Sequence, residues 1–326
     1  MNIGTKLRLG AACMAALLSR KRRPVFVGWA LTERCNLRCR YCHVWEKKPA
    51  AELDTGQVTG IIRDLHEQGV RLIKFSGGEP LLRKDLGDIV AFSRSLGIYT
   101  FISTNGTLFP SRIGELKHLA GLGTSLDGPE DVHDAIRGTG TYRATLAAME
   151  AARQERIPVK LTTVLSSANL DCWDHVLEVA ERFEAQVTFQ PATETVQFGT
   201  APNPMTPEAG RYRQAIRTLL ERKRTNRLIS NSAAGLRHLY HWPAPRSIHC
   251  VGGKLLLRLD CRGHIQPCSR LPLREGAPDA MTHGVRYCLD RLPVVDCQRC
   301  WCGSVVDLNL GAHFCLDAAI AMVRHG

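Results

Sequence analysis

Residues 25–45 read VFVGWALTERCNLRCRYCHVW, an apolar run followed by Cys35, Cys39 and Cys42. The run VFVGWAL has the apolar character of a buried strand. The cysteines follow it with gaps of three and two residues. Thiolates at this spacing can all face one cubane iron–sulfur cluster, which normally takes four cysteines. Three cysteines leave one iron with an open position where substrate or cofactor can bind, much as a catalytic zinc keeps a free site.

The chain after this stretch alternates apolar runs with amphipathic stretches. Runs that are apolar on both faces and joined by helices indicate a parallel sheet, and right-handed crossovers curl such a sheet into a full or partial barrel. The expected strands are 25–31, 70–76, 98–104, 121–127, 159–165 and 186–191. The expected helices are 54–69, 84–96, 110–120, 141–155, 170–184 and 207–224. We therefore expect an α/β fold, a partial (β/α)6 TIM-like barrel with a small cysteine-rich C-terminal domain.

Polar segments stand at or just beyond the ends of these strands, where a barrel places its active site. They are FSGGEP (75–80), STNGT (103–107), TSLDG (124–128) and DAIRGTGTY (134–142). Their order, with C-x3-C-x2-C and an aromatic residue before the last cysteine, resembles the radical S-adenosylmethionine (SAM) enzymes over roughly residues 24–191. In that family the open iron chelates the amino and carboxylate groups of SAM. One electron from the cluster then splits the sulfonium and yields a 5′-deoxyadenosyl radical that abstracts hydrogen from substrate.

The resemblance implies roles for individual residues. The ligands of the [4Fe–4S] cluster would be Cys35, Cys39 and Cys42. The residues that bind SAM would be Tyr41, Gly77, Gly78, Glu79, Ser103, Asn105, Ser125, Asp127 and Arg137. Among them, the GGEP segment would receive the amino group, Tyr41 would lie against adenine, and the guanidinium of Arg137 would form a forked pair near the carboxylate.

The residues leave other interpretations open. A structural zinc site with His43 as fourth ligand is the alternative for the three cysteines, because such sites want four closed ligands. Taken alone, GGEP is also compatible with a tight turn. The polar side chains that follow the next two strands are compatible with ordinary turn or cap residues. His43 and Trp45 are compatible with packing beside the loop.

A second group of cysteines follows in the C-terminal part. The stretch HCVGGKLLLRLDCRGHIQPC (249–268) places twelve residues between Cys250 and Gly263 and four between Gly263 and Cys268. This spacing resembles the opening of the SPASM and twitch extensions of radical SAM enzymes. We read it as a hairpin that turns at Arg262-Gly263 and brings the two cysteines towards each other.

The downstream half departs from that family pattern, because the run DCQRCWC (296–302) is C-x2-C-x-C. We expect one or two auxiliary iron–sulfur clusters; a zinc-ribbon-like site or ordinary buried thiols are the alternatives. The ligand candidates are Cys250, Cys268, Cys297, Cys300, Cys302 and Cys315. The cysteines expected not to bind metal are Cys13, Cys172, Cys261 and Cys288.

The composition narrows the class of protein. Eleven of the thirteen cysteines in the 326 residues fall into two groups, which indicates metal ligation in a reducing compartment rather than a secreted disulfide scaffold. The formal charge is +12, but aromatic residues are only 6%, and no nucleic-acid module is recognisable. We therefore do not expect nucleic acid as a partner.

Residues 1–23 contain six basic and no acidic side chains, with apolar residues near helical spacing. Two interpretations remain open. One is an interfacial helix on an anionic membrane; the other is a helix packed against the domain, with a solvated basic tail. The expected location is the cytoplasm, or its boundary with the inner face of the membrane.

We therefore expect a radical SAM enzyme that cleaves SAM reductively and abstracts hydrogen from a peptide, small-molecule or lipid-linked substrate. Its reductant would be a flavodoxin or a ferredoxin-type protein. The alternatives are a non-catalytic iron–sulfur or zinc-binding electron-transfer protein and an RNA-modifying radical SAM enzyme. The expected division is a basic helix (1–23), a barrel (24–225) and an auxiliary iron–sulfur domain (246–326).

Overall fold

The computed structural model describes residues 3–47, 51–197, 199–271, 273 and 276–325. Eight strands form one sheet in the order β6-β5-β4-β3-β2-β1-β7-β8, with every pair parallel except β7-β8. The strands are β1 (Phe26–Thr32), β2 (Leu72–Gly77), β3 (Tyr99–Ser103), β4 (Gly121–Ser125), β5 (Val159–Leu165), β6 (Gln186–Pro191), β7 (Leu256–Leu259) and β8 (Ile265–Gln266). The first six confirm the expected parallel α/β fold.

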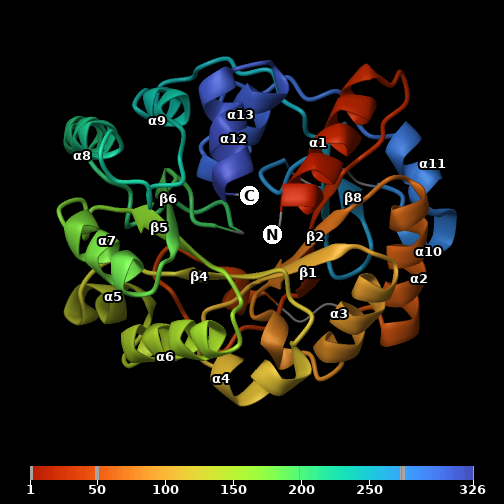
Figure 1. Ribbon diagram of the computed structural model, residues 1–326, viewed down its shortest axis with the longest axis horizontal. Helices are drawn as coiled ribbons and strands as arrows, with labels where there is room; N and C mark the ends of the chain where they lie inside the picture. The colour runs from red at the N-terminus through yellow and green to blue at the C-terminus, as the bar shows by residue number, and fades with distance from the viewer. Residues whose placement is uncertain (1–2, 48–50, 198, 272, 274–275, 326) are drawn as a thin grey trace.

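Helices surround this sheet, which curves around the centre of the molecule (Figure 1). The helices of the barrel segment are α2 (Thr55–Glu67), α3 (Leu86–Ser95), α4 (Phe109–Arg112), α5 (Glu130–Arg137), α6 (Thr141–Gln154), α7 (Trp173–Arg182), α8 (Ala209–Arg222) and α9 (Ala233–Leu239). The terminal segments add α1 (Ile3–Leu18), α10 (Ala280–His283), α11 (Val285–Asp290), α12 (Gly303–Ala312) and α13 (Leu316–His325). Figure 1 shows α2 to α7 outside the curved sheet, while α1, α12 and α13 lie across its open side.

Local sequence explains where these helices begin and end. Asp54 caps α2: its carboxylate accepts from the amide of Gln57 at 2.8 Å, and the Gln57 side chain accepts from the amide of Asp54 at 2.9 Å. The expected helix over 110–120 is shorter, because α4 passes into a single 3-10 turn, Ile113–Glu115. Gly114 lies in that turn, and glycine is a poor helix former.

The two faces of the sheet differ in chemistry. Successive residues of a strand face opposite sides, and on β1 the side chains of Val27, Trp29 and Leu31 are at most 1% exposed and join the core with the outer helices. The intervening residues, Gly28 and Ala30, therefore face the inner side. The same alternation along the other strands gives the barrel an outer, apolar face and an inner face that carries polar residues.

The C-terminal segment adds directly to the barrel sheet. β7 pairs with β1 in parallel, with Phe26 opposite Leu256, and β8 returns antiparallel to β7. This confirms the expected hairpin, whose turn contains Gly263 with φ of 88°. The predicted division into a basic helix, a barrel and an auxiliary domain stays a prediction. Its first two residues, 1–2, and its last, 326, lie outside the described residues.

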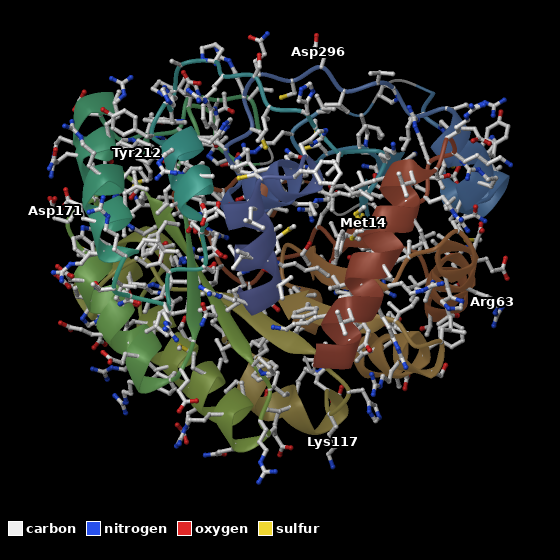
Figure 2. The ribbon with its side chains drawn as sticks, turned by 45° about the horizontal axis from the view of Figure 1, so that its top comes forward. Met14, Arg63, Lys117, Asp171, Tyr212 and Asp296 are labelled. Carbon is white, nitrogen blue, oxygen red and sulfur yellow. The ribbon has the colours of Figure 1, made fainter. Side chains whose placement is uncertain are left out.

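Helix α1 covers the amino-terminal ends of the strands. Leu9 and Ala16 are buried against a cluster that includes Phe26 and Leu72, the first residues of β1 and β2. Its opposite face leaves Met14 exposed, as Figure 2 shows. The packed interpretation of residues 1–23 is thus correct for one face of the helix. No helix in the described ranges has the length and apolar character needed to span a bilayer.

Candidate active site

The cysteine loop after β1 interlocks with the loop after β2. The amide of Gly78 donates to the carbonyl of Thr32, and the amide of Glu79 donates to the carbonyl of Arg34, each at 2.8 Å. A Cβ on Gly77 would lie 2.2 Å from the Thr32 oxygen, and one on Gly78 would lie 2.2 Å from the Arg34 oxygen. The two glycines therefore allow the GGEP segment to touch the backbone that leads into the cysteines.

Glu79 is fully buried and its carboxylate is engaged inside the protein. One oxygen accepts from the amide of Leu81 at 3.0 Å and from the hydroxyl of Thr104 at 2.7 Å; the other accepts from the amide of Asn105 at 2.8 Å. Burial raises its pKa, while these hydrogen bonds oppose the shift. Glu79 thus ties the ends of β2 and β3 together.

Asn105 extends this connection to the cysteine loop. Its side-chain amide donates to Asn36 at 2.8 Å, and Asn36 donates to the hydroxyl of Thr107 at 2.8 Å. Asn36 lies between Cys35 and Cys39. Asn36 and Thr107 were not among the predicted site residues, although their polar character so close to a cysteine motif and a strand end was a usable signal.

A buried ion pair lies on the other side of the cysteine loop. The guanidinium Nε of Arg137 donates to the Asp127 carboxylate at 2.6 Å, and the other oxygen of Asp127 accepts from the amide of Val164 at 3.0 Å. The Arg137 guanidinium also lies 5.3 Å from the ring centroid of Tyr41, close enough for a cation–π contact. Asp127 therefore orients Arg137, a relation that the sequence analysis did not anticipate.

Tyr41 is only 7% exposed and packs with Ile136 and Met205. Its carbonyl accepts from the amide of Gln197, whose own carbonyl accepts from the amide of His43, both at 2.9 Å. Through Gln197, the irregular segment after β6 therefore joins the cysteine loop as a short parallel bridge.

His43 and Trp45 support the same loop from outside. The imidazole Nδ1 of His43 lies 2.8 Å from the Glu46 carboxylate, and the indole of Trp45 donates to the carbonyl of Cys42 at 2.8 Å. His43 is thus partnered by a carboxylate and packs beside Trp45. Ser103 and Ser125 are the last residues of β3 and β4 and are half-buried on the inner face of the sheet.

The thiols of Cys35, Cys39 and Cys42 are half-buried and influence one another. Burial raises the pKa of Cys42 to about 11, and the two neighbouring thiols add to the shift. Within the described ranges, no three His, Cys, Asp or Glu side chains form a group that could hold a metal ion. Two thiolate sulfurs that bind the same zinc lie within about 4.6 Å of each other, which is twice the Zn–S bond length. In a cubane each thiolate binds a different iron, so the cluster holds the sulfurs farther apart.

Five C-terminal thiols form a second group. Burial raises the pKa of Cys300, and the charges of the other four thiols of the group raise it further. The group consists of Cys250, Cys268, Cys297, Cys300 and Cys302. Burial opposes the shift, but the pKa of Cys302 falls, because the charge of Arg258, hydrogen bonds from Ser304 and the amide of Val305, and the charge of Lys74 together outweigh burial.

The remaining C-terminal cysteines stand elsewhere. Helix α12 begins directly after Cys302 and its ten residues rise by about 15 Å, so Cys315 lies beyond its far end. Cys261 is buried near Asp260, and the Cys288 thiol lies 3.6 Å from the carbonyl of Pro278. The structure therefore does not bring Cys315 to the group of five.

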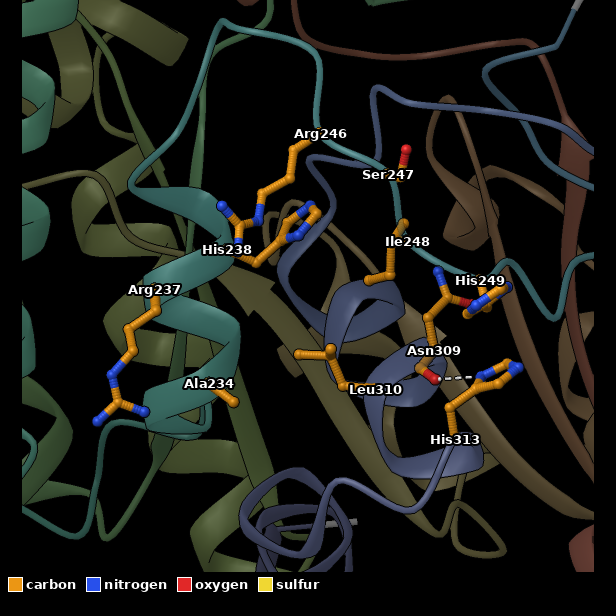
Figure 3. A pocket seen from close by; sticks show the side chains of 10 residues that line it. All are labelled: Ala234, Arg237, His238, Arg246, Ser247, Ile248, His249, Asn309, Leu310 and His313. Atoms are coloured by element: carbon orange, nitrogen blue, oxygen red, sulfur yellow. Dashed lines mark hydrogen bonds between the residues drawn. The ribbon is translucent and has the colours of Figure 1, made fainter.

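A pocket of about 370 Å³ lies between α9 and α12 (Figure 3), and two of its lining residues contact Cys300. The imidazole of His238 lies 3.1 Å from the carbonyl of Cys300, and the side-chain amide of Asn309 donates to its sulfur at 3.6 Å. The basic residues that line the pocket are Arg237, His238, Arg246, His249 and His313. This pocket therefore joins a cationic surface to a cysteine of the second group.

The family model of the Radical SAM superfamily matches residues 29–183, the segment that holds the cysteine loop and the segments interlocked with it. Residues 29–183 are therefore a radical SAM domain. The Fe-coproporphyrin III synthase of Methanosarcina barkeri is 37% identical over 158 residues, 47% of this chain and 39% of that protein. The mycofactocin maturase MftC of Mycolicibacterium smegmatis is 26% identical over 255 residues, 75% of this chain and 64% of that protein.

Solved structures share the fold beyond the radical SAM domain. A crystal structure of Streptococcus suis SuiB bound to S-adenosylmethionine matches with a TM-score of 0.67 at 15% identity, covering 81% of this chain and 64% of that one. Native anSMEcpe with bound AdoMet matches with a TM-score of 0.67 at 16% identity, covering 82% and 81%. The chain spans about half or less of the first curated relatives it matches, from 39% to 50% of their length.

A radical SAM domain implies a [4Fe–4S] cluster and SAM, and the donor set of the cysteine loop fits the cluster. Three mutually interacting thiols stand at the carboxyl end of β1, with the backbone of Gly77 and Gly78 against the same loop. The structure brings every residue predicted for SAM binding to the carboxyl ends of β1 to β4 or to the adjoining helix α5. Their individual contacts with SAM stay predictions.

Proposed function

We propose that this chain cleaves SAM reductively and uses the resulting 5′-deoxyadenosyl radical to abstract hydrogen from a substrate. The observation that carries the proposal is the interlocking of a three-cysteine loop with the GGEP segment at the mouth of the barrel. Cys35, Cys39 and Cys42 would hold the cluster. When bound, the cluster supplies the electron that splits the sulfonium of SAM.

The surrounding residues would bind and orient SAM. The glycines keep the backbone of the GGEP segment close to the cluster, and Glu79 fixes that backbone through its three internal hydrogen bonds. Arg137, held by Asp127, would offer its terminal nitrogens to the carboxylate of SAM. The half-buried Ser103 and Ser125 would line the same side.

We also propose an auxiliary [4Fe–4S] cluster in residues 246–326, beside a barrel of residues 24–225. Four of the five grouped thiols suffice for one cubane. Cys250, Cys268, Cys297 and Cys300 are the set we assign, because each has a thiol neighbour in the group. Arg258 acts on both Cys268 and Cys302, but Cys302 alone of the five also has Lys74 beside it.

A basic pocket beside Cys300 fits an acidic electron donor. The pocket carries Arg237 and Arg246 on its lining and reaches Cys300 through His238. Flavodoxins and ferredoxin-type proteins are the class of reductant we propose, because charge complementarity steers such encounters. The location of the enzyme would then be the compartment that holds these donors, the cytoplasm.

Exposed apolar side chains on α1 and α13 favour contact with an anionic lipid surface. They are Leu7, Met14 and Leu18 on α1 and Leu316, Ile320 and Val323 on α13, with Phe314 in the turn before α13. Lys6 joins the two helices, since its ammonium donates to the carbonyl of Val323 at 2.6 Å. Residues 1–23, which include α1, carry six basic and no acidic side chains, and such positive charge attracts an anionic lipid surface.

This orientation bears on the substrate. Thr5 of α1 lies 2.9 Å from the hydroxyl of Tyr99, the first residue of β3, so α1 covers the end of the barrel opposite the cysteine loop. A membrane under α1 would leave the mouth facing water. We therefore favour a water-borne substrate, a peptide or a small molecule, over a lipid-linked one.

The test is anaerobic reconstitution of the full chain with iron and sulfide, followed by dithionite and SAM. We expect 5′-deoxyadenosine from the native protein and none from the Cys35→Ala, Cys39→Ala and Cys42→Ala variants. Cys13→Ala, in α1, is the matched control and should retain the product. Product from a variant without these three thiols would contradict the assignment. Absence of product from the intact, iron-loaded native protein would favour a non-catalytic electron-transfer role.

A further inference from the structure

The inner face of the sheet carries three cationic side chains, and Lys74 interacts electrostatically with the other two. By strand register, Arg258 of β7 stands opposite Gly28 of β1, and Gly28 stands opposite Lys74 of β2. Lys160 of β5 points to the same side. Electrostatic interactions link Lys74 to both Arg258 and Lys160. All three side chains are half-buried.

A glycine creates the space for this arrangement. A Cβ on Gly28 would lie 1.6 Å from a terminal nitrogen of Arg258 and 2.5 Å from its guanidinium carbon. The guanidinium therefore lies over Gly28, the residue of β1 that stands between Arg258 and Lys74 in the strand register. Any larger residue in place of Gly28 would displace it. The local sequence thus keeps the inner face open at the point where Arg258 crosses it.

The three cations lack carboxylate partners. In the part of the chain that the structure describes, no ion pair joins Lys74, Lys160 or Arg258 to an acidic side chain. The anionic groups that act on them are Cys302 and Asp307.

Asp307 does not supply the missing partner, because its carboxylate accepts from the amide and the hydroxyl of Ser232 at 3.1 and 2.6 Å. Burial and the neighbouring charges of Arg258 and Lys160 lower the pKa of Lys74 to about 8. Cations that face one another without counter-charge cost stability in the absence of a ligand.

We propose that Lys74, Lys160 and Arg258 bind an anionic oxygen group of the substrate, a carboxylate or a phosphate. The proposal rests on the proposed function and names the class of its substrate. Lys74 lies three residues before Gly77, or about 10 Å along the strand. A substrate held by its anionic group at this depth would reach from there to the radical formed at the mouth. The guanidinium matches a forked oxyanion, and the two ammonium groups add point charges.

A competing role for the same cations is to neutralise the charge of Cys302 and of an auxiliary cluster beside it. The two roles differ in a measurable way. If the cations bind substrate, added anions in solution should bind to them and stabilise the protein. If they neutralise the cluster, removing them should change its reduction potential, and added anions should have no effect.

The experiment uses the full chain, reconstituted anaerobically, and measures its thermal unfolding midpoint with citrate, with inorganic phosphate and with chloride at matched ionic strength. We expect citrate or phosphate to raise the midpoint of the native protein by about 2–4 °C over chloride. The citrate arm reports carboxylate binding and the phosphate arm reports phosphate binding. Lys74→Gln, Lys160→Gln and Arg258→Gln should each lose this shift.

Two further variants keep the result interpretable. Lys74→Arg keeps the charge and should keep the shift, and Lys117→Gln, which removes an exposed lysine (labelled in Figure 2), should keep it as well. An equal shift of the unfolding midpoint in all variants would overturn the proposal. It would also be overturned if anions did not shift the midpoint of the native protein while Lys74→Gln, Lys160→Gln and Arg258→Gln altered the reduction potential of the cluster. Formation of 5′-deoxyadenosine by the native protein without added anions tests the proposed function separately.

Discussion

Asp127 and Arg137 form an ion pair of 2.6 Å in which the carboxylate is fully buried and the arginine is 8% exposed. The pair connects the end of β4 with the end of α5, and Arg137 in turn covers the ring of Tyr41 in the cysteine loop. An interaction predicted as two separate contacts with SAM is therefore also part of the framework that positions the cysteines.

Removing one partner of this pair should cost more than removing an exposed one. Arg137→Ala leaves the Asp127 carboxylate buried without its cation, and we expect the free energy of unfolding to fall by about 3–5 kcal/mol. Arg153→Ala breaks an exposed pair with Glu150 and should leave the free energy of unfolding nearly unchanged. Urea denaturation measures both. Equal losses in the two variants would show that the buried pair has no special role.

Gly78 should not tolerate a side chain. In Gly78→Ala the new Cβ would meet the carbonyl oxygen of Arg34 at 2.2 Å, so the two loops must separate. We expect a loss of about 1–3 kcal/mol together with loss of iron from the N-terminal cluster. Gly60→Ala is the control: it lies inside α2 with no atom within 4 Å of its Cβ and should stabilise the protein by about 0.5–1 kcal/mol. Full iron occupancy in Gly78→Ala would refute the interlocking role.

Glu79→Gln tests whether the Glu79 carboxylate stabilises the loops that follow β2 and β3, in addition to any contact with SAM. The amide of glutamine would turn an NH2 group towards a donor, either Asn105 or Leu81 and Thr104, which now give hydrogen bonds to Glu79. We expect a loss of about 1–3 kcal/mol in the protein without SAM, measured by urea denaturation. Unchanged stability would mean that Glu79 acts on the cofactor alone.

The alternation of strands and helices could be predicted because buried parallel strands are apolar on both faces and their helices are amphipathic. The cysteine loop and the GGEP segment could also be predicted, because each motif consists of residues that are close together in the sequence. The sequence also indicated the hairpin around Gly263. Its parallel addition to β1 was not visible, because Phe26 and Leu256 are distant in sequence and no local pattern encodes their register.

The finer roles at the site depended on which groups face each other. The sequence placed Glu79 and Asp127 at strand ends, but it could not show that amides of the protein already use Glu79 or that Asp127 pairs with Arg137. Gln197 escaped notice because a bridge between irregular segments has no periodicity. Cys315 and Cys302 were equivalent ligand candidates in the sequence. The structure distinguishes them, because helix α12 lies between them and keeps their thiols apart.

The auxiliary ligands can be assigned by counting iron. We expect the native protein to bind about eight irons, four for each cubane. Cys297→Ala should lower this number towards four and leave the N-terminal cluster in place, whereas Cys315→Ala should not change it. Iron analysis with electron paramagnetic resonance of the reduced protein makes the measurement. A loss of iron in Cys315→Ala would place that thiol in a cluster, against the separation that α12 imposes.

Membrane contact through α1 and α13 predicts a change that depends on where an apolar side chain is exposed. Leu7 and Leu316 are 69% and 72% exposed on the two helices, and glutamate at either position would add negative charge where the proposed lipid surface is anionic. We expect Leu7→Glu and Leu316→Glu to reduce flotation with phosphatidylglycerol vesicles. Val294→Glu alters a residue that is 89% exposed outside both helices and should float as the native protein does. Equal flotation of all four proteins, or flotation unchanged on neutral phosphatidylcholine vesicles, would remove the case for an anionic membrane under α1.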